Sequence, residues 1–323
     1  MMLLAAAEGK RVAVIGDAML DVYLRGDVDR ISPEAPVPVV RVRERKLALG
    51  GAANVANNIV SVGAICELVA AIGDDPAGAT LRDMLKRVGT DTRSLVSVNR
   101  PTTTKTRVLA RAHQLVRYDE EDDSDLAGEE SELLLKAVRV VVESADAVVL
   151  QDYNKGVLVP RVISHAIELA RSSEIPVVVD PKYRNFFSYR GATIFKPNRR
   201  ELHSALGAEV DLEHPQALPA TFERLGVEHL LLTLGEEGMA LLSADGEIGR
   251  IPTTAREVYD VVGAGDTVTA YLAVIMAAGG SPAEAAVIAN FAAGVEVGKL
   301  GAATVRTAEV LEAYDEFGQQ GTH

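Results

Sequence analysis

A Gly-Ala-Gly turn comes directly before Asp266 in the segment Tyr259–Thr267, and a run of mostly small apolar residues follows it. The run from Val268 to Ala278 has no glycine, proline or charge. It therefore predicts a buried helix, whose first free N–H groups belong to residues 263–266. Such N–H groups bind phosphate oxygens, and an acid beside them can take a proton from an attacking hydroxyl. The segment favours phosphoryl transfer, with a simple N-cap role for Asp266 as the alternative.

Two further segments have residue types that suit a polyol. Gly50 and Gly51 stand at the start of an apolar helical pattern, and Asn54 on its first turn could bond a sugar hydroxyl. An ordinary Gly-Gly turn with Asn54 as a cap explains the same pattern. Asp17 and Asp21 follow the first predicted strand, where a carboxylate can accept two hydroxyl hydrogen bonds. A turn-forming role for Asp17 is the alternative.

Two segments on the other half of the chain suit a nucleotide. Asn198 follows a short strand pattern and Glu201 stands three residues later, which is also the form of a capping box. Thr233 ends another strand pattern, and Gly235 and Gly238 after it would let backbone N–H groups face a phosphate. A hairpin turn explains the same glycines.

The composition describes a globular chain with a large core. The 323 residues are 48% hydrophobic, and 33 basic residues stand against 46 acidic ones. The net charge of −13 argues against a nucleic-acid or anionic-membrane surface. Cys66 is the single cysteine, which excludes an internal disulfide and a thiolate zinc site and fits a cytoplasmic protein. We expect Cys66 to be a buried structural thiol.

Three other features of the sequence give no prediction of a signal peptide, a membrane span or a metal site. The apolar start, Met1 to Ala7, is too short for a secretory signal and precedes its basic residues, so no signal peptide is expected. No stretch of about eighteen apolar residues predicts a membrane span. The acidic run Asp119–Asp125 is expected to be a solvated loop and not a metal site.

Short β-branched runs alternate with longer helical patterns along the chain. This order predicts an α/β fold with a mostly parallel sheet, and no interdomain linker is visible, so residues 1–323 are expected to form one domain. The predicted strands are Val12–Ile15, Glu67–Ile72, Ala147–Leu150, Pro176–Val179, Thr193–Phe195 and His229–Thr233. The predicted helices are Ala53–Val62, Ala77–Val88, Gly128–Ser144 and Arg161–Ser172.

Two regions break the alternation. Residues 22–47 and 101–119 have extended, alternating patterns and predict a small second sheet, which could act as a lid over the carboxyl ends of the main strands. A pair of long surface hairpins is the alternative. Such segments could also pair between subunits, which would give a homodimer through the lid.

The order of these motifs resembles the ribokinase-like, or PfkB, family of carbohydrate kinases, over nearly the whole chain. The motifs that carry the resemblance are Gly50–Asn54, Lys196-Pro197-Asn198 with Glu201, Thr233-Leu234-Gly235 and Gly263–Thr267. The resemblance implies a three-layer αβα sandwich with a β-sheet lid, and use of ATP and Mg²⁺. It implies that Asp266 is the catalytic base and that the backbone of Gly263, Ala264, Gly265 and Asp266 forms the anion hole.

The same resemblance assigns the binding residues. It implies sugar contacts at Asp21, Gly50, Gly51 and Asn54, and ATP contacts at Asn198, Glu201, Thr233, Gly235, Gly238 and Asn290. Glu201 would act on Mg²⁺ through water, because this cation keeps much of its hydration shell. Members of the family often hold a monovalent cation on carbonyls near Asp260 and Val262 and a loop near Gly301.

Within the family, three segments are similar to the kinases of the lipopolysaccharide heptose pathway: Arg30–Val39, Asp152–Gly156 and Asp180–Lys182. This implies that the substrate is D-glycero-β-D-manno-heptose 7-phosphate, with Asp152 near it, and that the product is the 1,7-bisphosphate for ADP-heptose and lipopolysaccharide core synthesis. Bifunctional relatives continue into a nucleotidyltransferase domain, so a single-activity kinase is expected. The alternatives are a kinase of this fold for another sugar or nucleoside, and a non-catalytic sugar-phosphate sensor.

The 7-phosphate of that substrate needs basic partners. The nearest candidates to the predicted ligand-facing motifs are Lys155, Lys182, Arg184, Lys105 and Arg111. We expect Lys182 and Lys155 to matter most. Exposed, solvated lysines are the alternative.

Overall fold

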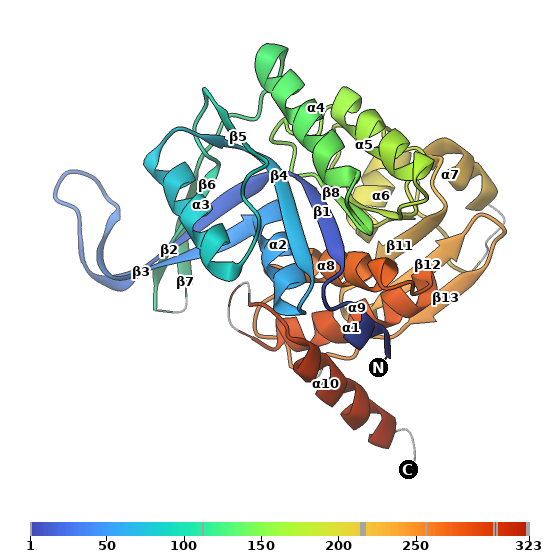
Figure 1. Cartoon of the computed structure of the whole chain (residues 1–323). Helices are drawn as coiled ribbons and strands as arrows, with labels where there is room; N and C mark the ends of the chain where they lie inside the picture. The colour runs from blue at the N-terminus through green and yellow to red at the C-terminus, as the bar shows by residue number, and fades with distance from the viewer. Residues whose placement is uncertain are drawn as a thin grey trace.

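The computed structural model describes residues 2–111, 113–213, 218–255, 257–299, 301 and 303–320. These residues form a nine-stranded sheet covered by helices on both faces, and a separate four-stranded sheet that projects from it (Figure 1). The strand order of the large sheet is β13-β12-β11-β10-β9-β8-β1-β4-β5. The predicted three-layer α/β architecture with a small second sheet is therefore confirmed.

The large sheet is built around β1, whose residues are buried from Val12 to Gly16 because both faces are covered. Strand β1 pairs in parallel with β4 and β8. At the other edge of the sheet, β12 pairs antiparallel with both β11 and β13. The strands are β1 Arg11–Gly16, β4 Ile65–Gly73, β5 Leu95–Val98, β8 Ala147–Gln151, β9 Val177–Asp180, β10 Ile194–Phe195, β11 His229–Thr233, β12 Met239–Ser243 and β13 Ile248–Ile251.

The helices divide between the two faces of this sheet. Val12 and Val14 pack with the buried residues of α2, α8 and α9, whereas Ala13 and Ile15 pack with those of α4 and α5. The helices are α1 Met2–Ala6, α2 Ala52–Ser61, α3 Pro76–Val88, α4 Gly128–Val142, α5 Pro160–Ser172, α6 Arg199–Leu206, α7 Leu218–Leu225, α8 Ala264–Ala277, α9 Pro282–Val297 and α10 Thr307–Gln320. No helix among the described residues is both long and apolar enough to cross a membrane.

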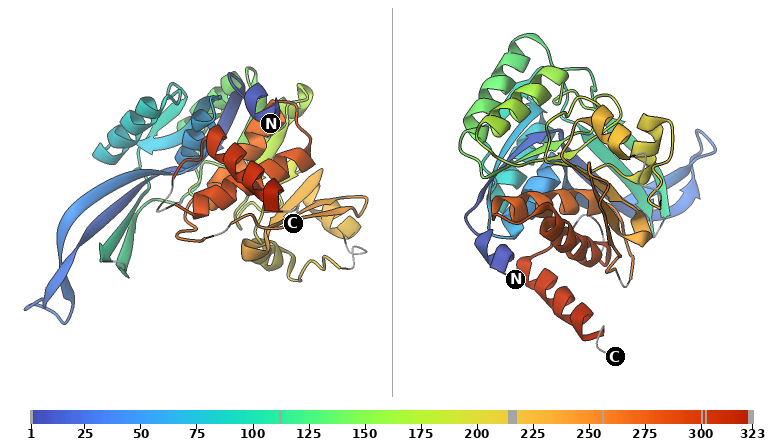
Figure 2. Two further views of the ribbon diagram at one scale, coloured as in Figure 1. Left: turned by 90° about the horizontal axis from the view of Figure 1, so that it is seen from below. Right: turned by 90° about the vertical axis from the view of Figure 1, so that its right-hand side faces the viewer.

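The small sheet has the order β3-β2-β6-β7, and its first two strands form a long hairpin that reaches well away from the body (Figure 2). These strands are β2 Ala18–Ile31, β3 Pro38–Gly51, β6 Thr104–Ala110 and β7 His113–Glu120. The two regions form two hairpins, β2–β3 and β6–β7. The parallel pairing of β2 with β6 joins these hairpins into one small sheet, so both the predicted sheet and its hairpin alternative describe part of the structure. We call this sheet the lid sheet.

The predicted strands and helices of the large sheet are confirmed to within two residues at each end. Helix α8 is also where the apolar run predicted it, and its residues from Asp266 to Ile275 are buried because α2, α9 and the sheet surround it. Cys66 lies fully buried in β4, and burial raises the pKa of its thiol, as expected for a structural residue.

Candidate active site

Asp266 lies on the first turn of α8 and accepts hydrogen bonds from three side chains, which come from two segments that are distant from it in sequence. Asn54 Nδ2 donates to Oδ2 at 2.9 Å. Gln151 Nε2 donates to Oδ1 at 3.0 Å, and the hydroxyl of Tyr153 donates to the same oxygen at 2.9 Å. The side chain is only 5% exposed, so these donors fix the orientation of the carboxylate.

The surroundings bring the pKa of Asp266 close to neutrality. Burial is the largest cause, and it raises the pKa to about 7, because desolvation disfavours the charged form. The hydrogen bonds from Asn54 and Tyr153 oppose this rise, as does the positive charge of Lys196, while the carboxylate of Asp180 adds to it. A carboxylate with a pKa near the working pH is suited to general base catalysis.

The backbone before Asp266 offers donors to an anion. Gly263 has a φ of 100°, a left-handed conformation that favours glycine, and it caps the N-terminus of α8. Among the described residues, no hydrogen-bond acceptor is found for the N–H groups of Gly265 and Asp266. Both groups therefore remain available to phosphate oxygens at the positive end of the helix dipole. The N–H of Ala264, which was also expected to be free, donates to the carbonyl of Val261 at 3.4 Å.

Two lysines, Lys196 and Lys182, bring positive charge close to Asp266. Lys196 Nζ lies 3.1 Å from Asp180 Oδ2, and both side chains are nearly fully buried. A Cβ on Gly265 would lie 3.7 Å from Lys196 Nζ, which places this pair beside the first turn of α8. Lys182 forms an ion pair with Glu201. Burial lowers the pKa of Lys182, but the charges of Asp180, Glu201 and Asp266 outweigh this effect and raise the pKa above its ordinary value.

Four residues of this cluster were not assigned a role from sequence: Gln151, Tyr153, Asp180 and Lys196. Each is the last residue of a strand or follows one within two positions, as β8, β9 and β10 end at 151, 180 and 195. The carboxyl ends of parallel strands meet at one edge of the sheet, so this position was the available signal.

The predicted sugar-side residues lie together where the lid sheet joins α2. A Cβ on Gly50 would lie 2.6 Å from Asp21 Oδ2, and one on Gly51 would lie 2.4 Å from the carbonyl oxygen of Asp17. Both glycines are therefore needed for close packing. Asp21 Oδ1 pairs with Arg107 of β6 at 2.5 Å, so the carboxylate has a partner on the lid that sequence did not indicate.

Asp17 and Asp152 organise the loop that follows β8. The carboxylate of Asp17 accepts the backbone N–H groups of Tyr153, Lys155 and Val157 at 2.7, 3.0 and 3.2 Å. Asp152 accepts the Asn154 N–H and a hydrogen bond from a tyrosine hydroxyl, each at 2.7 Å, while burial raises its pKa to about 6. The turn-forming alternative therefore describes Asp17 well, and both oxygens of Asp152 have partners within the protein.

Asn198 and Glu201 form the capping box that was their alternative interpretation. Asn198 Oδ1 accepts the Glu201 N–H at 2.9 Å, and Glu201 Oε2 accepts the Asn198 N–H at 2.9 Å. The remaining oxygen of Glu201 pairs with Lys182. Because Lys182 lies 5.4 Å from the ring centroid of Tyr153, it connects this cap to the side chains around Asp266.

The other predicted nucleotide residues lie at the end of β11 and on α9. Thr233 forms a bridge with Asn198, so the two segments are neighbours. Gly235 and Gly238 have φ values of 64° and 93° and lie in the hairpin turn between β11 and β12, where Thr233 pairs with Met239. The side chain of Asn290 is buried and donates to the carbonyl of Pro252 at 2.8 Å.

The acidic run is not simply a solvated loop, and this prediction is wrong for two of its members. Lys105 Nζ lies 3.2 Å from Asp119 and 3.6 Å from Glu121, and Lys155 Nζ lies 2.6 Å from Glu121. Both acids are partly shielded from solvent, because Asp119 on β7 lies opposite Lys105 of β6 and Glu121 directly follows β7. Lys105 and Lys155, two of the candidates for binding the 7-phosphate, therefore lie close together beside the lid sheet. Arg184 instead pairs with Asp123, and Arg111 lies exposed beyond the end of β6.

A second acidic group fits a cation site. Asp260 accepts the N–H groups of Val262 and Gly301 at 3.0 and 3.2 Å, which joins the two loops expected to hold a monovalent cation. Glu296 on α9 is fully buried. The backbone N–H of Ala303 approaches its carboxylate, but no described residue completes a hydrogen bond to either oxygen. Burial, followed by the charge of Asp260, raises the pKa of Glu296 to about 8. An unpaired buried carboxylate is a fitting neighbour for a cation.

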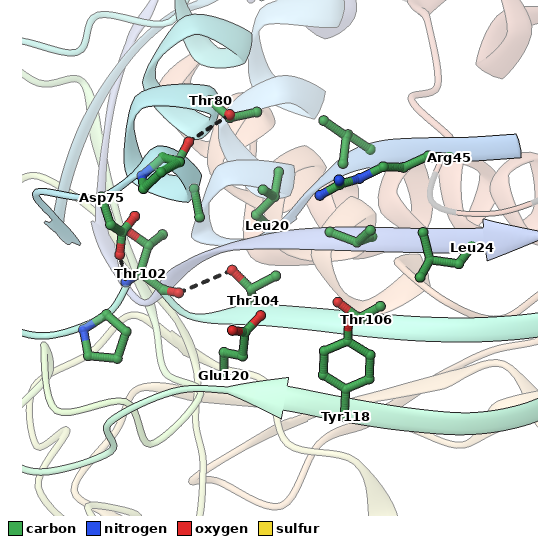
Figure 3. Close-up of a pocket in the computed structure, with 15 residues that line it drawn as sticks. Leu20, Leu24, Arg45, Asp75, Thr80, Thr102, Thr104, Thr106, Tyr118 and Glu120 are labelled. Atoms are coloured by element: carbon green, nitrogen blue, oxygen red, sulfur yellow. Dashed lines mark hydrogen bonds between the residues drawn. The ribbon is translucent and has the colours of Figure 1, made fainter. Parts of the chain in front are cut away.

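The face of the lid sheet opposite to Asp21 and Arg107 borders a cavity of about 750 Å³ (Figure 3). Strand alternation places Asp21 and Arg107 on one face and Leu20, Thr106 and Tyr118 on the other. Figure 3 shows the latter side chains gathered along β2, β6 and β7. The cavity is therefore separate from the Asp266 cluster.

Comparisons with known proteins agree with this arrangement. The family model for pfkB family carbohydrate kinases matches residues 10–308. Bifunctional protein HldE of Rhodospirillum rubrum is 45% identical over 306 residues, which are 94% of this chain and 62% of that protein. The chain thus spans less than two thirds of this relative.

Solved structures share the fold. Ribokinase of Arabidopsis thaliana complexed with ribose and ATP aligns with a TM-score of 0.74 and 22% identity, over 95% of this chain and 98% of that one. Phosphofructokinase-2 of Escherichia coli in complex with potassium aligns with a TM-score of 0.76 and 17% identity, over 96% and 99% of the two chains. At these identities the likeness shows a ribokinase-like fold.

Proposed function

The chain belongs to the pfkB family of carbohydrate kinases, and we propose that it transfers a phosphoryl group from ATP to the anomeric hydroxyl of D-glycero-β-D-manno-heptose 7-phosphate. The product would be the 1,7-bisphosphate, which serves ADP-heptose and lipopolysaccharide core synthesis in the cytoplasm. The observation that carries the reaction class is a buried carboxylate, Asp266, beside free N–H groups at the start of α8. The heptose substrate rests on the sequence resemblance and on similarity to the bifunctional relative.

In the proposed reaction, Asp266 accepts the proton of the attacking hydroxyl as its oxygen bonds to the γ-phosphorus, while the bond from that phosphorus to the β–γ bridging oxygen breaks and ADP leaves. The N–H groups of Gly265 and Asp266 stabilise the charge that develops on the transferred group, and Lys196 adds positive charge beside them. Asn54 holds the base from the sugar side. Because phosphoryl transfer depends mainly on positioning and charge stabilisation, these groups are sufficient on the protein side.

We place ATP along the ends of β10 and β11, next to Asn198, Thr233, Gly235, Gly238 and Asn290. Mg²⁺ would supply charge neutralisation of the phosphates. Glu201 fits a role through water, because one of its oxygens caps α6 and the other pairs with Lys182, so neither is a free ligand.

A monovalent cation would occupy the loops near Asp260, Val262 and Gly301, with the charge of Glu296 beside it. Its charge would offset the two carboxylates below the anion hole. Thermal midpoints in KCl and in choline chloride test this proposal. The wild type should be stabilised by KCl and Glu296→Gln much less, whereas an equal shift in both proteins contradicts it.

The 7-phosphate is proposed to bind beside Lys155 and Lys105. Both lysines are largely buried between the lid sheet and the loop after β8, on the same face of the lid as Asp21. Arg107 lies beside them, held by Asp21. Phosphate would compete with Asp119 and Glu121 for the lysines, which links substrate binding to the position of the lid.

We also propose that the chain forms a homodimer through the outer face of the lid sheet. This face borders a cavity lined by apolar and threonine side chains together with Arg45, Asp75 and Glu120. Val116 and Tyr118 on the same face are 51% and 48% exposed. A second lid sheet packed against it would cover these side chains.

The proposal is tested by measuring ADP release with a panel of acceptors: heptose 7-phosphate, ribose, fructose 1-phosphate and adenosine. The highest kcat/KM is expected for heptose 7-phosphate. A preference for an unphosphorylated sugar or a nucleoside would assign the chain to another substrate of the same fold. Sugar binding without any ADP formation would indicate a non-catalytic sensor.

A further inference from the structure

One side-chain amide lies between two carboxylates at the centre of the site. Gln151 is the last residue of β8 and is fully buried. Its Nε2 donates to Asp180 Oδ2 at 3.0 Å and to Asp266 Oδ1 at 3.0 Å. A primary amide has two N–H bonds, so it can donate to both acids at the same time.

The other end of the same amide has no partner. Among the described residues, no donor is found for Gln151 Oε1. A rotated amide would turn this oxygen toward the two carboxylates and would leave the Nε2 donors unpaired, so the carboxylates fix the orientation. A buried acceptor without a donor lowers stability. The position is therefore poorly explained as a purely structural one, and its effect on the two acids is the better explanation.

The effect on Asp266 follows from its neighbours. The charged and titratable groups that act on it come from several elements: Tyr153 after β8, Asp180 on β9, Lys182 after β9, Lys196 after β10 and Glu296 on α9. Asp180 and Glu296 are acids that disfavour a second negative charge. A neutral donor that bridges Asp180 and Asp266 stabilises both deprotonated carboxylates and stops either from rotating toward the other.

We propose that Gln151 is a positioning residue for the catalytic base: it holds Asp266 deprotonated and correctly oriented by donating to Asp266 and Asp180 at once. This inference rests on the proposed function, in which Asp266 is the base. It adds a role for a residue whose hydrogen bonds go to the two acids, so its loss should change turnover and pH dependence more than substrate binding.

The test is Gln151→Met, which keeps the length of the side chain and removes both donors. We expect kcat to fall about 10- to 100-fold, with both KM values within about threefold. The acid limb of the kcat/KM profile should move upward by about one pH unit, because the deprotonated base has lost a donor. Val149→Ala on the same strand is the matched control, since it disturbs β8 packing without touching Asp266. It should lower the thermal midpoint and leave the pH profile unchanged.

A second variant covers the case in which Gln151→Met does not fold. Gln151→Glu has the same shape and, once ionised, turns a third negative charge toward the two acids. At pH 8 it should lose more turnover than Gln151→Met. An unchanged pH profile in Gln151→Met, or near-normal turnover of Gln151→Glu at pH 8, overturns the positioning role. Near-normal turnover of Asp266→Asn would instead overturn the proposed function, so the two failures can be told apart.

Discussion

Asn54 and Asp266 form a buried hydrogen bond of 2.9 Å although 212 positions separate them in the sequence. The first residue belongs to the helix that follows the Gly50-Gly51 turn, and the second begins the helix that follows the Gly-Ala-Gly turn. This bond brings the predicted sugar contacts and the predicted base to one point. Two helices of the same layer, α2 and α8, pack directly against each other to hold it.

Replacing Asn54 should therefore impair the sugar half of the reaction. Asn54→Leu removes the donor to Asp266 Oδ2 and a candidate partner for a sugar hydroxyl. We expect kcat/KM for the sugar phosphate to fall about 100-fold, while the KM for ATP stays within about threefold. Asn185→Leu is the control, because Asn185 donates to the Leu158 carbonyl away from Asp266. Equal changes in the kinetics for both substrates would contradict this role of Asn54.

Turnover should depend on a single ionisation near neutral pH. Burial raises the pKa of Asp266 to about 7, and the base must be deprotonated to accept a proton. The kcat/KM should therefore fall about tenfold per pH unit below pH 7 and level off above it. The same carboxylate in the unfolded chain ionises near pH 3.8, so between these values the folded state binds the extra proton and stability decreases as pH rises. A flat profile from pH 5.5 to 8 would argue against Asp266 as the base.

Lys155 and Lys182, which were both expected to bind the 7-phosphate, should differ in their effects on the kinetics. Lys155 pairs with Glu121 of the lid, whereas Lys182 pairs with Glu201 on the nucleotide side. Lys155→Met should raise the KM for the sugar phosphate about 10-fold or more and leave that for ATP nearly unchanged. Lys182→Met should lower kcat and affect ATP as well. Initial-rate kinetics with each substrate varied separately will separate these effects, and identical patterns in the two variants would reject the assignment.

The outer face of the lid sheet should form the interface of a homodimer. Val116→Glu places a charge on the exposed outer face of β7, where a second lid sheet would bury it. Sedimentation velocity at micromolar concentration should show a dimer for the wild type and a monomer for the variant. Val140→Glu changes an exposed valine of α4, outside the lid, and should leave the dimer intact. A monomeric wild type, or a dimeric Val116→Glu protein, would exclude this interface.

The large sheet could be predicted from sequence because each of its inner strands is a short apolar run covered on both faces. Val12–Ile15 and Ala147–Leu150 have no alternative to a buried parallel strand in such an order of elements. Strands β12 and β13 were not assigned. Gly235 and Gly238 before β12 fit a hairpin turn as well as a nucleotide loop, and the antiparallel pairing of Thr233 with Met239 in the folded sheet shows the hairpin.

The site was predictable where a motif carries its own geometry. The Gly-Ala-Gly turn defines a helix N-terminus, so the place of Asp266 followed from local sequence. Gln151, Asp180 and Lys196 act through contacts between strands that are adjacent only in the folded sheet, and no local pattern marks them. The acidic run was misread for the same reason, because Lys105 and Lys155 reach Asp119 and Glu121 only after the lid sheet has formed.

The most direct test of the account is the identity of the product, measured by ³¹P NMR after incubation with ATP, Mg²⁺ and heptose 7-phosphate. The account predicts a new phosphate signal coupled to the anomeric proton, with the 7-phosphate signal retained. It also predicts that Asp266→Asn lowers the rate of this reaction by several orders of magnitude while ATP binding is kept. Phosphorylation of another hydroxyl, or near-normal turnover by Asp266→Asn, would contradict it.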